Sequence, residues 1–225
     1  KKALKPYKAK ALLGSNPTIT NSIYILSVAK SMGKKIINAQ HGGAYGYQKN
    51  QSTFLEVELP IFDQFLTWGW TKLPNHPALS QLQAYPLPSP WMSERKNYWK
   101  DFKIDNSKQF DILWMPNNLK RFTWAPEGSK SNRRDIKNEF SSLMIDFMSH
   151  ALKSKIKVYC KAYSPSAVFM MSETYNKLEE MGGDNFKLCD NYDKGLTFEL
   201  LEKCNLVLFD QPSTGFFECL NCNIP

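Results

Sequence analysis

Short apolar runs alternate with helix-like stretches along the chain, and this alternation restricts the fold more than any other feature. In the second half the apolar runs lie at residues 110–115, 155–160, 186–189 and 206–210. The segments between and after them predict helices over 133–153, 166–181 and 196–204 and from residue 214 onward. This order predicts parallel strands joined by helices, with ligand-binding loops at the carboxyl ends of the strands.

The first half begins with the same alternation. A strand is predicted over 9–13, and a helix from Thr20 or Asn21 runs to a stop at Gly33. The next strand, over 35–39, completes a β-α-β unit, which implies a parallel sheet. Further strands are predicted over 62–68 and 82–85; the latter lies in a proline-rich stretch that excludes a long helix.

These elements predict an α/β protein of two Rossmann-like domains. We expect the first domain over residues 1–95, a linker over 96–108 and the second domain over 109–225. The chain starts with Lys1-Lys2 and ends with Asn223-Ile224-Pro225, as if cut before a strand. Both domains are therefore expected to be truncated, one at each end of the chain.

Composition excludes several classes of protein. Hydrophobic residues make up 42% and charged residues 22%, as in folded globular proteins and unlike disordered ones. An apolar run of roughly 18 residues, which a membrane-spanning helix needs, is absent, and so is a secretory signal. The five cysteines are an odd number and are expected to be reduced thiols. We therefore expect a cytoplasmic protein, with peripheral contact at the inner face of the membrane.

Charge is distributed unevenly between the two halves. Residues 1–108 contain 15 Lys/Arg against 6 Asp/Glu, and residues 109–225 contain 14 against 15. A basic half beside a neutral half predicts an anionic partner for the first domain: a membrane surface, an acidic glycan or, least expected of the three, nucleic acid. The alternative is that the lysines near the start are simply a solvated terminus.

The first cluster that could carry chemistry follows the strand over 35–39. It reads Gln40-His41-Gly42-Gly43-Ala44-Tyr45-Gly46. Glycines allow a sharp turn and a close approach to a ligand, and a histidine with a pKa near 6.5 suits proton transfer. This pattern predicts His41 as a general base; the alternative is a glycine turn with an incidental histidine. His76 and His150 show no partner pattern.

The second cluster follows the strand over 206–210 and includes Asp210, Ser213, Thr214 and Glu218. Hydroxyls at a helix start can bind phosphate, because free N–H groups and the helix dipole favour anions there. The glutamate, about one turn further, could accept ribose hydroxyls. The alternative is an ordinary capped helix.

Two more loops lie at strand ends of the same half. They carry Asn117 and Arg121 in one case, and Lys161 and Ser164 in the other. Each loop supplies a cation for a nucleotide phosphate, although single cations are often solvated surface charges. The chain contains no Walker A, GxGxxG, GxSxG or HExxH motif and no metal-ligand spacing.

These clusters, in this order, resemble a family of surface-carbohydrate transferases that carries a Gln-His-Gly-Gly-x-Tyr-Gly loop, present here as residues 40–46. More distantly they are similar to CDP-glycerol glycerophosphotransferases and capsule β-Kdo transferases, which have a GT-B-like fold. The cytidylyl-type enzymes usually carry an arginine and a His-Pro after the middle strand. Lys161 and Ser164-Pro165 stand there in this chain.

The resemblance implies a metal-independent glycosyltransferase-type enzyme without a resident cofactor. His41 would be the base, and Gln40, Gly42, Gly43 and Tyr45 would form the acceptor loop. The second domain would bind a nucleotide-sugar or nucleotide-polyol donor, and the acceptor would be an anionic glycan or a lipid-linked one. The alternatives are a sugar-nucleotide epimerase or hydrolase of the same fold, and a non-catalytic module that binds glycan or nucleotide.

Overall fold

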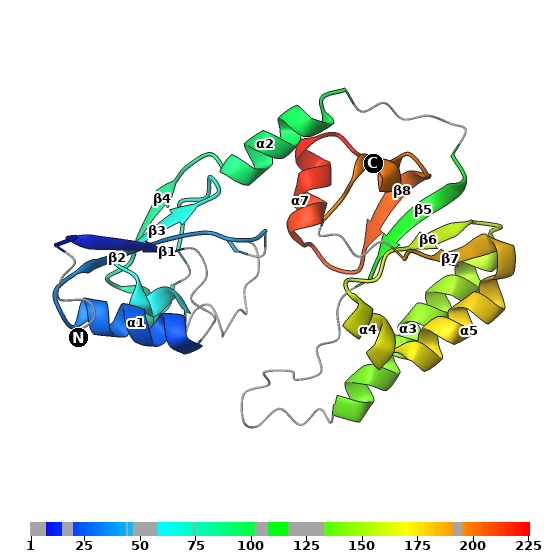
Figure 1. Cartoon of the computed structure of the whole chain (residues 1–225), viewed down its shortest axis with the longest axis horizontal. Helices are drawn as coiled ribbons and strands as arrows, with labels where there is room; N and C mark the ends of the chain where they lie inside the picture. The colour runs from blue at the N-terminus through cyan, green and yellow to red at the C-terminus, as the bar shows by residue number, and fades with distance from the viewer. Residues whose placement is uncertain are drawn as a thin grey trace. The chain divides into compact units, whose positions relative to one another are not determined.

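The computed structural model divides the chain into two compact units, Lys1–Tyr98 and Trp99–Pro225 (Figure 1). Each unit is described by itself. The division falls inside the segment 96–108 where the sequence places a linker. The structure describes residues 8–14, 20–43, 45–46, 58–73, 75–101, 108–116, 133–190 and 195–225.

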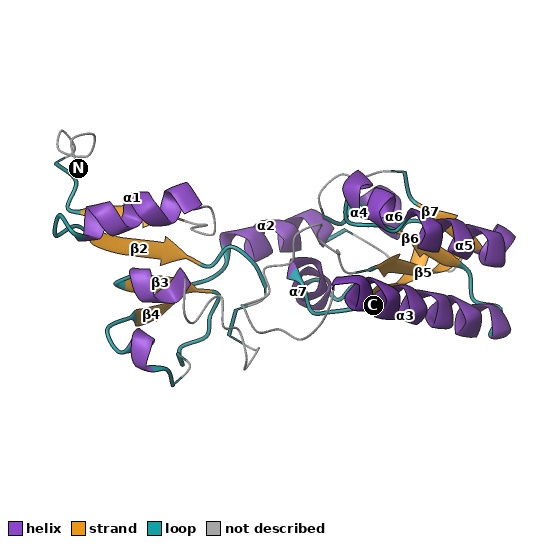
Figure 2. Ribbon diagram, turned by 90° about the horizontal axis from the view of Figure 1, so that it is seen from below, coloured by secondary structure: helices purple, strands orange, loops and turns teal. Residues whose placement is uncertain are grey.

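The first unit is built on a parallel sheet whose strands follow chain order, β1-β2-β3-β4. The strands are β1 (Ala11–Gly14), β2 (Lys35–Ala39), β3 (Gln64–Thr67) and β4 (Gln83–Pro86). Helix α1 (Thr20–Lys30) connects the first two strands and packs along β2 (Figure 2). Gly33 ends this crossover with a φ of +73°, which a glycine adopts without strain.

The core of the first unit lies between the sheet and its short helical turns. Two 3-10 turns supply part of it, η3 (Leu59–Ile61) and η4 (Pro77–Leu79). Phe65 of β3 is fully buried and contacts the rings of Phe62, Tyr45 and Trp70. The aromatic packing at the carboxyl end of β3 therefore extends directly into the loop that follows β2.

The second unit is built on a parallel sheet with the strand order β7-β6-β5-β8. Its strands are β5 (Phe110–Met115), β6 (Val158–Cys160), β7 (Phe186–Leu188) and β8 (Cys204–Phe209). Its helices are α3 (Arg133–Lys153), α4 (Pro165–Met170), α5 (Ser172–Gly182), α6 (Phe198–Leu201) and α7 (Thr214–Asn221), with a 3-10 turn η5 (Gly183–Asn185) after α5. Chain order reverses between β5 and β8, so this sheet has the topological switch point of a Rossmann fold.

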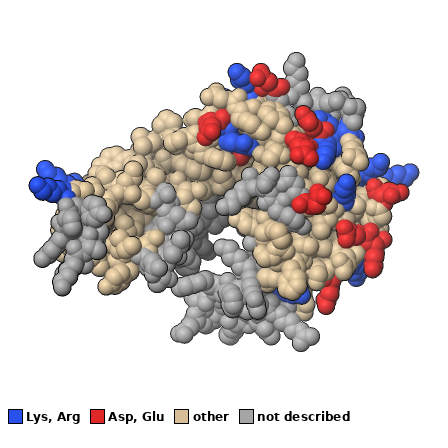
Figure 3. Space-filling view, viewed as in Figure 1, with Lys and Arg blue, Asp and Glu red and all other residues tan. Residues whose placement is uncertain are grey.

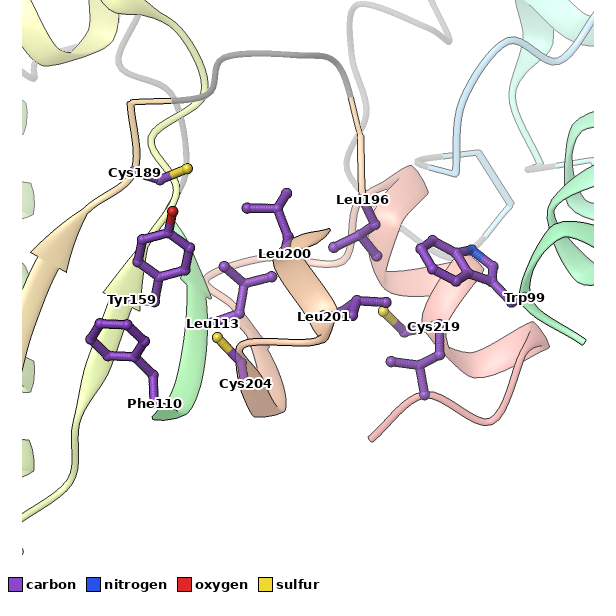
Figure 4. Packing of buried hydrophobic residues seen from close by; sticks show 11 residues of the cluster. Trp99, Phe110, Leu113, Tyr159, Cys189, Leu196, Leu200, Leu201, Cys204 and Cys219 are labelled. Carbon is purple, nitrogen blue, oxygen red and sulfur yellow. The ribbon is translucent and has the colours of Figure 1, made fainter. Parts of the chain in front are cut away.

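Hydrophobic clusters fill both faces of the second sheet. On one face α3 and α5 pack side by side over Trp114, Val158 and Cys160 (Figure 1). On the other, α6 contributes Leu200 and Leu201 and α7 contributes Cys219 to the cluster drawn in Figure 4. In this cluster the rings of Phe110 and Tyr159 stack with their centroids 5.1 Å apart. This cluster also takes in Trp99, the last residue of α2 (Pro90–Trp99).

The sequence predictions of the fold are confirmed in class and in most elements. Both units are α/β with parallel sheets, and the helix expected over 133–153 has those bounds. The single helix expected over 166–181 is wrong, because Met171 leaves the helical region (φ −114°, ψ 24°) and separates α4 from α5. The strand expected over 206–210 starts earlier, at Cys204.

Three surface and composition features can be compared with the sequence: charge distribution, membrane-spanning helices and cysteine state. On the face shown in Figure 3, acidic and basic side chains are interspersed over the second unit. Within the described part of the chain, no helix combines the length and the apolar character needed to cross a membrane. All five cysteines are free thiols, and four of them are buried.

Candidate active site

The loop after β2 is held in place by the Gln40 side chain. Its Oε1 accepts hydrogen bonds from the backbone N–H of Trp68 at 2.9 Å and from the indole Nε1 of Trp70 at 2.8 Å. Its Nε2 donates to the carbonyl of Gly42 at 2.7 Å. The residue is buried, and its backbone N–H continues the ladder to Leu66 of β3. The Gln40 amide is thus used by the loop itself and fastens it to the end of the neighbouring strand.

Packing of the loop against the Trp70 ring requires a glycine at position 46. Its φ is +88°, which L-residues rarely adopt, and a Cβ at this position would lie 2.8 Å from the Trp70 ring. Because the Trp70 indole is bound by Gln40, the ring has little freedom to move away. A glycine here therefore lets the loop close against Trp70.

His41 lies at the carboxyl end of β2, directly after Gln40. The Tyr45 Oη lies 2.9 Å from its Nδ1 and 3.5 Å from its Nε2, and the two rings meet edge to face with centroids 5.2 Å apart. The His41 side chain is 28% exposed. Partial burial lowers its pKa below the usual value, because desolvation disfavours the charged ring. The structure therefore provides a neutral imidazole near pH 7 that a substrate can still reach.

A third residue of this cluster, Glu58, was missed by the sequence predictions. The Tyr45 hydroxyl donates to Glu58 Oε1 at 2.7 Å, and the same oxygen lies 3.9 Å from His41 Nδ1. Glu58 is 2% exposed and immediately precedes η3. Its Oε2 is buried without a hydrogen-bond partner among the described residues. Three side chains with ionisable groups thus form the series His41, Tyr45, Glu58.

Burial changes the proton affinities of Tyr45 and Glu58. Desolvation raises the pKa of Glu58, an effect that the hydrogen bond from Tyr45 partly offsets. Desolvation, followed by the Glu58 charge and hydrogen bond, raises the pKa of Tyr45 well above its usual range. Tyr45 therefore stays protonated at any physiological pH.

Asn38 is a second buried polar side chain on β2. It shares a face of the strand with Ile36 and Gln40, two residues away on either side. Both of its amide atoms are buried and without hydrogen-bond partners among the described residues. Its Oδ1 lies 3.2 Å from where a Cβ would stand at Gly14, its register partner on β1.

In the second unit, the switch point is spanned by a hydrogen bond. Trp114 of β5 donates its Nε1–H to Asp210 Oδ1 at 2.7 Å, and Asp210 directly follows β8. Lys161, which follows β6, is 4% exposed, and its backbone N–H bonds to the carbonyl of Trp114. The structure thus brings two of the predicted nucleotide-binding residues to the carboxyl ends of strands that flank β5.

The remaining predicted residues of this unit differ in how they are used. Ser164 caps α4 by accepting from the Ala167 N–H at 3.2 Å. Ser213 is the N-cap of α7, but its hydroxyl makes no capping hydrogen bond, and Thr214 is the first helical residue. Glu218 is 1% exposed and accepts from the Trp99 indole at 2.8 Å. Its contact with ribose stays a prediction.

Asn117 and Arg121 lie outside the described residues. Within the described ranges, no group of three or more His, Cys, Asp or Glu side chains could hold a metal ion.

A histidine at one strand end and a Rossmann-type switch point in the other sheet define an α/β fold class that supports many different reactions. Over residues 1–225 the chain matches the LIC12162 family transferase, and it belongs to that family. No curated protein matches the sequence.

Two solved structures are similar in outline. One is a UDP-GlcNAc 2-epimerase from Methanocaldococcus jannaschii, with 11% identity and a TM-score of 0.49 over 100% of this chain and 62% of that chain. The other is a glycosyltransferase from Rickettsia africae ESF-5, with 11% identity and a TM-score of 0.40 over 92% of this chain and 52% of that chain. This chain therefore spans about half to two thirds of the length of these proteins.

Proposed function

We propose that the chain belongs to a glycosyltransferase-type enzyme, GT-B-like in plan. It moves a sugar or a polyol phosphate from a nucleotide-activated donor to a hydroxyl of a surface-polysaccharide acceptor. The observation that carries the proposal is His41, a neutral and partly exposed imidazole fixed on a loop at a strand end. Membership of a transferase family supports it.

In this reaction His41 takes the proton of the acceptor hydroxyl. The acceptor oxygen then forms a bond to the transferred group, while the bond between that group and the nucleotide phosphate breaks. The nucleotide leaves as its phosphate anion. A positioned base of this kind accelerates a reaction by roughly 10²–10⁴-fold.

The donor nucleotide is placed on the second unit, at the carboxyl ends of β5, β6 and β8. Lys161 and the Ser213–Thr214 start of α7 support this placement, since helix starts and cations stabilise phosphate. Asp210 lies beside them, held by the Trp114 indole. We propose that the helix start and Lys161 neutralise the leaving phosphate without a metal ion. A chelator should then leave turnover unchanged.

The acceptor is assigned to the first unit. Residues 1–108 carry 15 Lys/Arg against 6 Asp/Glu, an excess that suits an anionic glycan or a lipid-linked acceptor at the inner face of the membrane. Gln40, Gly42, Gly43 and Tyr45 would shape the loop beside that acceptor, with Gln40 acting through its hydrogen bonds to Trp68 and Trp70.

The test has two stages. Calorimetry with CMP, CDP, UDP and GDP first identifies the nucleotide. Transfer from the corresponding activated donor is then measured for wild type, His41→Ala and His41→Gln, with His76→Ala as the matched control. We expect both His41 variants to lose roughly 10²–10⁴-fold in turnover while they keep the nucleotide affinity and the melting temperature, and the control to behave as wild type.

Other outcomes would point to other functions. A folded His41→Ala enzyme with more than about a tenth of wild-type turnover contradicts the assignment of His41 as base. Interconversion of the sugar without transfer would indicate an epimerase. Nucleotide release without an acceptor would indicate a hydrolase, and nucleotide binding without any turnover a binding module.

A further inference from the structure

We propose that Tyr45 and Glu58 are positioning residues that hold the His41 imidazole in the Nδ1–H tautomer, so that Nε2 is left unprotonated to accept the proton of the acceptor hydroxyl. The proposal rests on the assignment of His41 as base. It adds two residues and a direction to that assignment: the protons of the series point from His41 through Tyr45 to Glu58.

The direction follows from what each atom can donate. An ionised carboxylate only accepts, so the 2.7 Å contact between Tyr45 Oη and Glu58 Oε1 uses the one proton of the tyrosine hydroxyl. Toward His41 the tyrosine oxygen then presents only lone pairs. The 2.9 Å contact with Nδ1 therefore needs a proton on Nδ1.

The second ring nitrogen is the one left for the substrate. Nε2 is 3.5 Å from the tyrosine oxygen, at the limit of a hydrogen bond, whereas Nδ1 lies at 2.9 Å. A neutral imidazole carries one N–H, so protonation of Nδ1 makes Nε2 the basic atom.

The surroundings keep this arrangement rigid. Tyr45 is buried and its ring lies 5.4 Å from that of Phe65 in the core of the first unit. Glu58 is almost completely enclosed at the start of η3. Neither side chain can change partner without moving core residues, which is what a positioning role requires.

Glu58 also supplies a charge. When Nε2 takes a proton, the ring becomes an imidazolium whose Nδ1 lies 3.9 Å from Glu58 Oε1. A buried carboxylate at this distance stabilises that cation, because the interior screens charges less than water does. Among the described residues, the titratable side chains that bond or pair with His41 are Tyr45, from its own loop, and Glu58, from the start of η3.

The tautomer can be read directly by long-range ¹H–¹⁵N NMR of the histidine rings, without substrates. The chain holds three histidines, and the other two serve as references. His150 Nδ1 lies 2.7 Å from the carbonyl of Asp146, which only accepts, so His150 is an Nδ1–H ring. His76 Nδ1 accepts from the Ala78 N–H, so neutral His76 is an Nε2–H ring.

We expect the neutral His41 ring to give the His150 pattern. Tyr45→Phe should shift it toward the His76 pattern, because the acceptor for Nδ1–H is gone while the ring packing remains. Glu58→Gln should keep the Nδ1–H pattern, since the carbonyl oxygen of the introduced amide still accepts from Tyr45, but should lower the titration midpoint of His41 because the negative charge is removed. Tyr85→Phe and Glu94→Gln are the matched surface controls and should change neither quantity.

Some results would overturn the proposal. They are an Nε2–H pattern for His41 in the wild type, an unchanged pattern in folded Tyr45→Phe, or an unchanged or raised midpoint in folded Glu58→Gln. A variant that does not fold is replaced by wild-type measurements alone, since the wild-type pattern already decides the tautomer. Because the spectra need no donor or acceptor, they can fail while His41→Ala still abolishes transfer, and the reverse also holds.

Discussion

The two units place polar side chains at strand ends in different ways. In the first sheet, strand order follows chain order, and the site comes from a loop whose side chains bond to one another and to the next strand. In the second sheet, chain order reverses between β5 and β8, and the strand order itself brings Asp210 beside Trp114. A change in the side chain that fastens the first loop, Gln40, should therefore affect folding and chemistry together. A change at the start of α7, where the Ser213 hydroxyl makes no capping hydrogen bond, should affect ligand affinity alone.

The largest effect on stability is expected from Gln40→Ala. It leaves the N–H groups of Trp68 and Trp70 without their acceptor, and each such loss costs roughly 1–3 kcal/mol. We expect the free energy of unfolding of the first unit to fall by about 2–6 kcal/mol, measured by urea unfolding followed through tryptophan fluorescence. Gln83→Ala, at an exposed position of β4, is the control. If Gln40→Ala lowers the free energy of unfolding no more than Gln83→Ala does, the Gln40 hydrogen bonds do not stabilise the first site.

Gly46→Ala, compared with Gly69→Ala, tests whether the packing of the loop against Trp70 stabilises the first unit. Both glycines have nearly equal φ, +88° and +89°, but only at Gly46 would a Cβ meet the Trp70 ring. The backbone strain is therefore matched, and the clash should add roughly 1–3 kcal/mol of destabilisation at Gly46. Melting temperatures of the two variants give the difference directly. Equal melting temperatures would show that the loop can move away from Trp70 at little cost in stability.

The double change Ser213→Ala with Thr214→Ala addresses the second unit. The Ser213 hydroxyl makes no capping bond, so the stability of α7 should change little. Nucleotide affinity should weaken by roughly 1–3 kcal/mol through lost hydrogen bonds to phosphate, as measured by calorimetry. Ser172→Ala, at the exposed start of α5, is the control. Unchanged affinity in the folded variant would place the nucleotide elsewhere.

The smallest effect concerns the basic first half. If its charge attracts an anionic acceptor or membrane, binding to anionic vesicles or an acidic glycan should weaken as salt rises, because exposed charges are screened within about 10 Å at 0.1 M. Co-sedimentation over a salt series measures this, with neutral vesicles as the control. If binding does not change with salt, or if neither anionic vesicles nor the acidic glycan is bound, the excess positive charge is only a solvated surface.

The sequence predicted the fold more completely than the site. Apolar runs bounded by glycine or proline marked all the described parallel strands. Such signals can be read from residues close together in the sequence. The break at Met171 was missed, since residues 166–181 keep helical spacing across it. His41 was singled out because it lies just after the end of a predicted strand and before two glycines; its role as a base stays a prediction.

There is a physical reason why the sequence did not indicate Glu58. It reaches Tyr45 from 13 residues along the chain, and no spacing rule connects a loop to the start of a later 3-10 turn. Its neighbours offered no signal either, because a glutamate between Val57 and Leu59 follows the apolar–polar alternation of a half-exposed strand. Likewise, Gln40 was expected to serve the acceptor, and only the structure shows its bonds to Trp68 and Trp70.

The Gln40 hydrogen bonds also determine when the loop can form during folding. Their partners lie 28 and 30 residues further along the chain. Closing a chain segment of that length costs about 3 kcal/mol of entropy, which the loop cannot recover from local contacts. On a ribosome, the His41 loop therefore stays unformed until Trp70 has emerged. The loop that carries the proposed base is therefore complete only after the third strand has joined the sheet.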